Sequence, residues 1–253
     1  MKIAVCIKQV VTREWQLRVN DAKTWIRDQD ASFELNEPDA YALEEALRLK
    51  EKHGGEVIVC SAGPARATQV IREALARGAD RAVQVESDAL VSADANAVAD
   101  ALASAIRDEQ VDLVLTGLQS DDQGFGQVGV VLAEKLGMPH ATIIMEVQKS
   151  DSGLRVKREL EGGWFQWVSL PLPALLTIQS GINQLRYATL KGIMAAKKKE
   201  IRKVAAPASA QTTQRITSIY FPEKGKKTQM LPGSPADAAK ELVKRLREEA
   251  RAL

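Results

Sequence analysis

The first 150 residues alternate between short apolar runs and longer stretches whose apolar residues recur at helical spacing. The apolar runs lie at residues 3–10, 56–61, 81–86, 111–117 and 141–147. The helical stretches lie at residues 39–52, 64–77, 93–109 and 126–136. Runs that are apolar on both faces are typical of a parallel sheet covered by helices on each side. The alternation therefore predicts an α/β fold, Rossmann-like and doubly wound, with a mostly parallel sheet and helices on both faces.

The pattern changes after residue 150. Residues 154–160 and 164–170 flank Glu161-Gly162-Gly163, which predicts an added hairpin, and residues 174–178 form one more apolar run. Residues 181–234 show no sustained periodicity, although apolar residues are scattered among them. Ordering each residue costs about 1–2 kcal/mol of backbone entropy, so such a segment is either disordered or wraps another surface. Its apolar content favours wrapping.

Residues 235–253 have the spacing of an amphipathic helix. We therefore expect three parts: an α/β domain with its hairpin at residues 1–180, a wrapping arm at 181–234, and a C-terminal helix at 235–253.

Composition narrows the functional classes only a little. Lys and Arg total 35 against 33 Asp and Glu, a net charge of +2, which gives no argument for nucleic acid as a partner. The apolar runs are too short to cross a bilayer, and the chain begins directly with a strand pattern, so we expect a cytoplasmic protein without membrane insertion. Cys6 and Cys60 lie inside apolar runs without CxxC spacing, which predicts buried, reduced thiols. We expect no metal site and no hydrolase chemistry, because no Cys/His cluster or nucleophile elbow is present in the sequence.

Open α/β sheets bind ligands beyond the carboxyl ends of their strands. Four segments qualify by position, at residues 6–9, 36–39, 61–64 and 117–129. The last contains four glycines and precedes a predicted helix, so its backbone amides and the helix N-terminus favour a phosphate. The spacing matches neither a Walker loop nor a strict GxGxxG, and a solvated turn is the alternative.

Several motifs resemble one known family. The stretch VKRELEGGWFQWV at 156–168, followed by PALLT at 173–177, resembles the signature hairpin of electron-transfer flavoprotein beta subunits. RYATL at 186–190, with Ile193, Met194 and the lysines at 197–199, resembles their partner-recognition loop. Asn36 with residues 44–50, and residues 74–80, resemble two further segments, so the similarity extends from residue 2 to about residue 202.

The resemblance implies an electron-carrier subunit rather than an enzyme. In this family the beta subunit binds AMP and pairs with an alpha subunit, with which it shapes the site of a shared FAD. The heterodimer passes electrons from dehydrogenases, such as acyl-CoA dehydrogenases, to a quinone oxidoreductase or a similar acceptor. The alternative is an electron-bifurcating variant, which is NADH-dependent and has a second FAD in the beta subunit in place of AMP.

Two departures from the family pattern bear on that choice. Glu37 separates Asn36 from Pro38, and Gly124-Phe125-Gly126 replaces residues that are commonly acidic or polar. Both changes keep AMP and FAD open, whereas the Glu-Gly-Gly of the hairpin favours the AMP type. A stand-alone nucleotide sensor of a related fold is the rival function, and a long wrapping arm argues against it.

Carried over by position, the resemblance implies two sets of site residues. The nucleotide site comprises Cys6, Asn36, Glu37, Pro38, Asp39, Ala62, Gly117, Gln119, Ser120, Asp121, Asp122, Gln123, Gly124, Phe125, Gly126, Gln127, Val128 and Gly129. The recognition loop comprises Arg186, Tyr187, Leu190, Ile193 and Met194, with Leu190 as the apolar anchor. Taken without the resemblance, Leu190, Ile193 and Met194 favour a buried patch over a docking surface.

Overall fold

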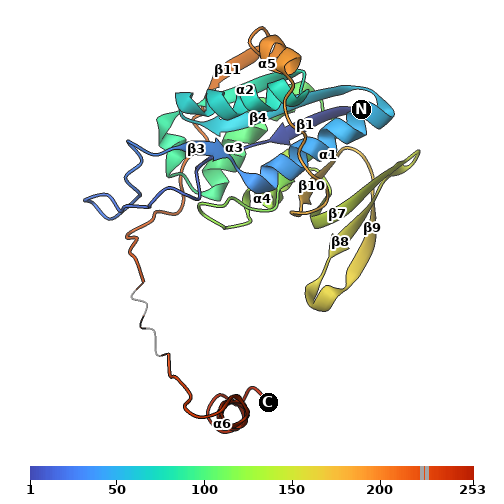
Figure 1. The fold of residues 1–253 in the computed structure, drawn as a ribbon. Coiled ribbons are helices and arrows are strands. Elements are labelled where there is room, and N and C mark those ends of the chain that lie inside the picture. Colours follow the sequence, from blue (N-terminus) through green and yellow to red (C-terminus); the bar gives the residue numbers. More distant parts are fainter. Residues whose placement is uncertain (223–224, 226–227) are drawn as a thin grey trace. The chain divides into compact units, whose positions relative to one another are not determined.

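A single large sheet organises the protein. The computed structural model describes residues 1–222, 225 and 228–253. Nine strands pair in the order β11-β5-β4-β1-β6-β10-β7-β8-β9 (Figure 1). Their bounds are β1 Lys2–Cys6, β4 Glu56–Gly63, β5 Arg81–Glu86, β6 Leu113–Gly117, β7 His140–Ser150, β8 Gly153–Glu159, β9 Phe165–Leu170, β10 Ala174–Ile178 and β11 Ile201–Ala205. Strands β11 through β7 are parallel to their neighbours, and β8 and β9 are antiparallel.

Helices cover both faces of this sheet, as predicted. Helices α1 (Glu37–His53) and α2 (Thr68–Arg77) pack on one face, and α3 (Ala95–Ile106) and α4 (Val128–Leu136) pack on the other. Alternate side chains of β1 enter the two cores, since Ile3 belongs to the first and Ala4 to the second. The Rossmann-like, doubly wound fold is confirmed.

The first strand is shorter than the predicted run at 3–10. It ends at Cys6, because the Lys8 N–H donates to Asp39 Oδ2 at 2.8 Å instead of to a neighbouring strand. Residues Gln9–Val11 form β2, which pairs with β3 (Phe33–Leu35) in a separate two-stranded sheet. This small sheet carries the loop at 12–32.

The predicted hairpin is present as β8 and β9. Its turn contains the short 3₁₀ segment Glu161–Gly163, in which Gly162 has φ 68°. Trp164, Phe165 and Trp167 are exposed on it, and Lys157 lies over the Phe165 ring. These aromatic residues therefore belong to the surface and not to the core. Cys6 and Cys60 are buried and free, as predicted.

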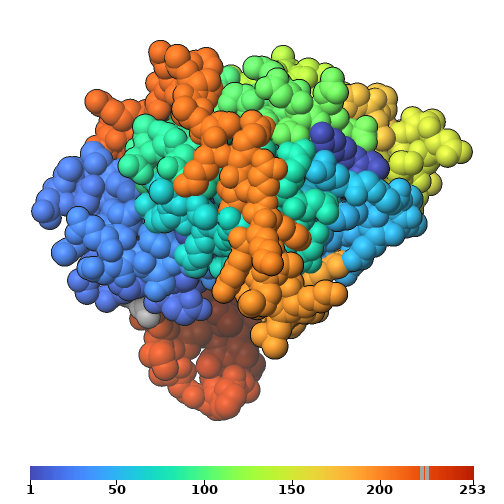
Figure 2. Space-filling model, turned by 90° about the horizontal axis from the view of Figure 1, so that it is seen from above, coloured from blue at the N-terminus to red at the C-terminus, as the bar shows by residue number. Residues whose placement is uncertain are grey.

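The structure divides the second half of the chain differently from the expected boundary at residue 180. Residues 190–196 form α5 (Leu190–Ala196), and β11 then pairs with β5 as the edge strand of the main sheet. Ile182, Leu185 and Ile201 pack against the first core. Figure 2 shows this segment, in orange, lying across the helices drawn in cyan and teal. The first part of the arm therefore folds on this chain's own core.

The structure forms two compact units, Met1–Ile219 and Tyr220–Leu253. The second contains α6 (Pro235–Glu248), which covers most of the predicted C-terminal helix. Ser234 caps its N-terminus, since the Ser234 Oγ accepts the Asp237 N–H. No helix among the described residues is long and apolar enough to cross a bilayer. Within the same residues, no group of three or more His, Cys, Asp or Glu side chains is placed to hold a metal ion.

Candidate nucleotide-binding site

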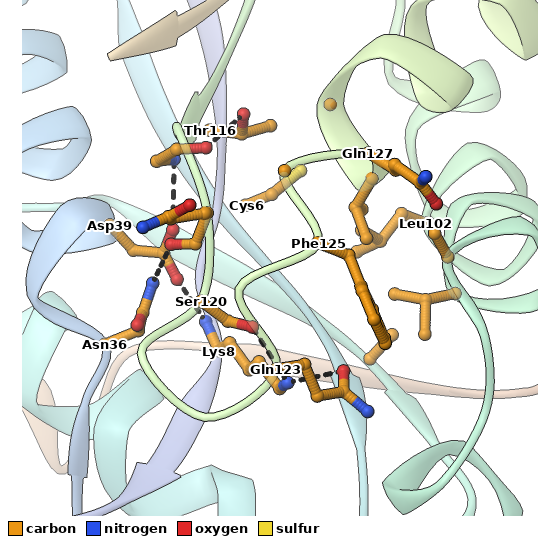
Figure 3. Close-up of a pocket in the computed structure, with 18 of the residues that line it drawn as sticks. Cys6, Lys8, Asn36, Asp39, Leu102, Thr116, Ser120, Gln123, Phe125 and Gln127 are labelled. Atoms are coloured by element: carbon orange, nitrogen blue, oxygen red, sulfur yellow. Dashed lines mark hydrogen bonds between the residues drawn. The ribbon is translucent and has the colours of Figure 1, made fainter. Parts of the chain in front are cut away.

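A pocket lies at the carboxyl ends of β1, β4 and β6, where an open α/β sheet is expected to bind its ligand. It encloses about 800 Å³ of space between atoms, part of it open to solvent. Figure 3 shows Lys8, Asn36 and Asp39 on one side of the pocket, with Leu102 and Phe125 on the other.

Most of the residues predicted for the nucleotide site line this pocket. They are Cys6, Asn36, Asp39, Ala62, Gly117, Gln119, Ser120, Gln123, Phe125, Gly126, Gln127, Val128 and Gly129. The other predicted residues, which lie beside the lining, are Glu37, Pro38, Asp121, Asp122 and Gly124. Glu37 forms an ion pair with Arg13, and Asp122 with Lys8, so both acidic groups are used on the rim.

Asn36 and Asp39 hold the glycine-rich loop in place. Asn36, which is 1% exposed, donates through Nδ2 to Gln119 O at 3.0 Å and accepts the Asp121 N–H at 2.9 Å. Asp39 accepts the Gly117 N–H at 3.0 Å and the Lys8 N–H at 2.8 Å. One short segment at the start of α1 thus fixes the exits of both β1 and β6.

The close approach of this segment explains the glycine at 117. A Cβ atom there would lie 2.5 Å from Asp39 Oδ1, closer than van der Waals contact permits. Burial raises the pKa of Asp39 to about 7, although the hydrogen bonds from Lys8, Asn36 and Gly117 act in the opposite direction. The carboxyl group is therefore a structural tie whose charge varies near neutral pH.

One cation, Lys8, reaches the pocket from the segment that follows β1. The Lys8 ammonium group lies 2.7 Å from Asp122 Oδ1, 3.0 Å from Gln123 Oε1 and 3.3 Å from Ser120 Oγ. All three partners belong to the loop after β6. A charged group is therefore present at the rim, where it is able to interact with an anionic ligand.

Two of the helices that begin at the pocket, α3 and α4, differ at their N-termini. Helix α3 is capped by Asp94, whose Oδ1 accepts the Ala97 N–H at 2.9 Å. Gln127, the residue before α4, makes no side-chain hydrogen bond to the helix, so the N–H groups of the first turn of α4 remain available. An anion is therefore favoured at α4 and disfavoured at α3.

Asp94 also binds the chain beyond β11. Its Oδ2 accepts the Thr213 N–H and the Thr213 hydroxyl, each at 2.7 Å, and the Gln214 N–H at 2.8 Å. Burial would raise the pKa of Asp94, but these bonds together with that from Ala97 outweigh it and lower the pKa to about 2. The carboxylate therefore stays charged at neutral pH and joins the pocket wall to residues 213–214.

Sequence reasoning missed part of the lining, above all the apolar residues Leu90, Val98 and Leu102. The additional lining residues are Ile7, Lys8, Leu90, Ala93, Asp94, Ala95, Val98, Leu102, Thr116 and Leu118. Lys8 falls within the segment at 6–9 that qualifies by position, and a basic residue directly after a strand is a usable signal. Leu90, Val98 and Leu102 carry no such signal, because an apolar residue near a helix start is typical of any core.

The residues predicted for the recognition loop lie together on α5 and just before it. Leu190 is 84% exposed and Met194 62%, and Tyr187 and Ile193 are also exposed. The interpretation as a buried patch is therefore wrong. Arg186 is different, since its guanidinium group binds Glu44 and Glu51 of α1 within the same chain.

Comparison with known proteins decides the family. The model of the Electron transfer flavoprotein domain matches residues 24–209. A protein from Methylophilus methylotrophus named Electron transfer flavoprotein subunit beta is 37% identical, with 98% of each chain covered. The chain belongs to the family of electron-transfer flavoprotein beta subunits.

Other relatives in this family give the same result. The Bacillus subtilis protein of that name is 34% identical over 100% of both chains, and that of Bos taurus is 35% identical over 98% of this chain and 97% of the relative. Beta subunits of electron-transfer flavoproteins are electron carriers and not enzymes. The resemblance drawn from the hairpin and loop motifs is thereby confirmed.

Proposed function

We propose that this chain binds AMP in the pocket at the sheet edge and pairs with an alpha subunit to form a flavin-carrying heterodimer. The heterodimer takes electrons from dehydrogenases, acyl-CoA dehydrogenases among them, and gives them to a quinone oxidoreductase or similar acceptor. FAD, shared with the alpha subunit, would supply the one-electron chemistry. This chain's own residues would bind the nucleotide and present docking surfaces.

The division of the pocket into two walls carries the nucleotide proposal. Leu90, Val98, Leu102 and Phe125 offer an apolar wall suited to an adenine base. The uncapped N-terminus of α4, the backbone of the glycine loop and the Lys8 ammonium group suit a phosphate. A nucleoside monophosphate has both parts.

Exposed apolar residues support the proposed partners. Trp164 on the hairpin is 74% exposed, and Leu242 and Val243 on α6 are exposed as well. Large apolar residues that gather on one exposed surface, as Trp164, Phe165 and Trp167 do on the hairpin, commonly mark a site where a protein meets another molecule. The exposed residues Leu190, Ile193 and Met194 of α5, which we call the α5 stripe, form a third such surface. We assign this surface to the dehydrogenase.

Nucleotide analysis of the co-expressed heterodimer tests the proposal. We expect one AMP and one FAD per heterodimer after acid release and chromatography, and reduction of the flavin by an acyl-CoA dehydrogenase with its substrate. Val98→Trp should fill the pocket and abolish AMP retention. Val131→Trp is the matched control, because Val131 packs against the same core as Val98 but lies outside the pocket lining. A heterodimer without nucleotide, or with an unreduced flavin, would contradict the proposal.

The electron-bifurcating variant remains the second candidate. A neighbouring hollow shares Lys8, Ala62 and Leu90 with the first pocket. A ligand longer than AMP would extend from one into the other. Two FAD molecules per heterodimer and no AMP would favour this candidate over the first.

A further inference from the structure

The short helix α5 lies with its small residues against α2 and its large apolar residues outward. A Cβ atom on Gly192 would lie 2.2 Å from Ala76 O, and Ala196 is 3% exposed, so both residues face α2. Leu190 and Met194 lie four positions apart and are exposed on the opposite side. The close packing leaves the helix little freedom to rotate about its own axis.

Hydrogen bonds fix the chain at both ends of α5. After the helix, Arg72 Nη1 donates to Ala196 O at 2.6 Å and to Lys199 O at 2.7 Å. Before it, Asn183 Nδ2 donates to Glu45 Oε2 and to Tyr41 O, each at 3.1 Å. The apolar stripe is therefore presented by a segment that α1 and α2 hold from behind.

The strongest of these anchors is Arg186. Its Nε and Nη2 donate to the two carboxylate oxygens of Glu44, each at 3.0 Å, and its backbone N–H donates to Glu44 Oε2 at 3.1 Å. Nη1 and Nη2 also bind Glu51. A bidentate pair of this kind fixes direction as well as distance.

Because Glu44 is buried, its carboxylate depends on the hydrogen bonds from Arg186. Glu44 is 3% exposed, and burial alone would raise its pKa, but the bonds from Arg186 and Arg48 outweigh burial and lower it. Without Arg186, the buried Glu44 carboxylate would keep only its hydrogen bond from Arg48. The arm would then lose its fixed path at the residue directly before Tyr187.

We infer that Arg186 is a positioning residue, which together with Glu44 holds the α5 stripe in its docking orientation and does not itself touch the partner. All three guanidinium nitrogens are already bound to carboxylates of this chain. The inference rests on the proposed docking of a dehydrogenase at this stripe. Lys191, Lys197 and Lys198 are exposed beside it, so the partner that fits is a protein with an apolar recess bordered by carboxylates.

Glu44 distinguishes positioning from contact, because a residue buried in this chain cannot reach a partner. In the assembled heterodimer, with an acyl-CoA dehydrogenase as electron donor, we expect Arg186→Gln and Glu44→Gln each to raise KM by about tenfold at nearly constant kcat, since the stripe must be reordered on docking. Hydrogen exchange of residues 186–196 should accelerate by about tenfold in both variants. The double variant should be no worse than either single one, because the two residues act as a unit.

Controls separate this inference from the proposed function. Leu190→Ala should raise KM without changing hydrogen exchange, and nucleotide content and Tm identify any variant that fails to fold. Glu51→Gln, on the exposed side of the clamp, provides a milder second test. If Leu190→Ala leaves KM unchanged, the docking function fails and the inference with it. If Leu190→Ala and Arg186→Gln raise KM but Glu44→Gln does not, docking stands and Arg186 is a contact residue.

Discussion

Residues 182–205 and residues 220–253 both follow the hairpin and both contain scattered apolar side chains, yet the structure treats them differently. The first stretch contributes α5 and an edge strand to the main sheet, whereas α6 in the second has no buried residue. The difference lies in the partners of their charged residues. Arg202 of β11 binds Glu109, 93 positions away, whereas Arg245 of α6 binds Glu241 one turn away.

Long-range ion pairs therefore distinguish the part of the arm that packs on the main sheet. Glu109 is 7% exposed and binds Arg81 and Arg202, with Lys2 at 3.4 Å. Lys199 similarly donates to Leu75 O and Ala79 O at the end of α2. Among the described residues of the stretch at 220–253, the ion pair of α6 lies within one helical turn, and such an exposed pair contributes little to stability.

Removing the charge of Glu109 should have the largest effect. Glu109→Gln leaves Arg81 and Arg202 without their shared carboxylate, so we expect the free energy of unfolding to fall by about 3–5 kcal/mol at pH 7. Urea denaturation measures this. The matched control is Glu241→Gln in α6, which should leave the free energy of unfolding unchanged within error. Equal effects at the two sites would show that the proposed distinction is false.

The same residue should make stability depend on pH. Hydrogen bonds from Arg81, ahead of those from Arg202, lower the pKa of Glu109 to about 2 from an ordinary value of 4.5. Its stabilisation is therefore complete above about pH 4.5 and is lost as pH falls from there through about 2, by about 3 kcal/mol in all. The stability difference between wild type and Glu109→Gln should shrink between pH 5 and pH 3. A difference that stays constant would contradict the assignment.

Adding a methyl group at Gly192 tests how closely α5 packs against α2 within the stretch at 182–205. Because the added Cβ would meet Ala76 O at 2.2 Å, Gly192→Ala should push α5 away from α2 and cost about 1–3 kcal/mol. Thermal unfolding and hydrogen exchange of residues 190–196 report the change. The same substitution at Gly225, where a Cβ meets no atom within 4 Å, is the control. Unchanged exchange at α5 would mean that the helix is not seated as described.

The smallest effect is expected from ending the chain at Ile219. The unit Met1–Ile219 is compact by itself, so its free energy of unfolding should stay within about 0.5 kcal/mol of its value in the full chain. Differential scanning calorimetry compares the two forms. A loss above about 1 kcal/mol would show that residues 220–253 stabilise the body after all.

Local patterns predicted most of the fold. Strands such as β5 are short apolar runs, and helices such as α1 have apolar residues at helical spacing. The edge strand β11 was not predictable in this way. Its sequence, IRKVA, contains two adjacent charged residues and resembles an exposed segment. The carboxylate that neutralises Arg202 belongs to Glu109, in the 3₁₀ turn after α3. Edge strands commonly carry such charges, so apolar content alone does not reveal them.

The glycine-rich half of the pocket was predictable from sequence, whereas the opposite wall was not. Glycines after a strand and before a helix have a direct physical meaning, and the loop at 117–129 does line the pocket. Val98 and Leu102 reach the same space because α3 packs beside α4, and Leu90 reaches it from the 3₁₀ turn before α3. The double role of Asp94 likewise depends on Thr213, 119 positions away, which no local pattern indicates.

The ties made by Asn36 and Asp39 also set the order in which the protein assembles. They join residues 31, 78 and 85 positions apart, so the loop geometry cannot form until β1, α1 and β6 are all in place. Contacts of such separation form late, because the intervening chain must first be closed. Any ligand of this pocket therefore meets only the completed domain, and by mass action it shifts the folding equilibrium toward chains that have finished folding.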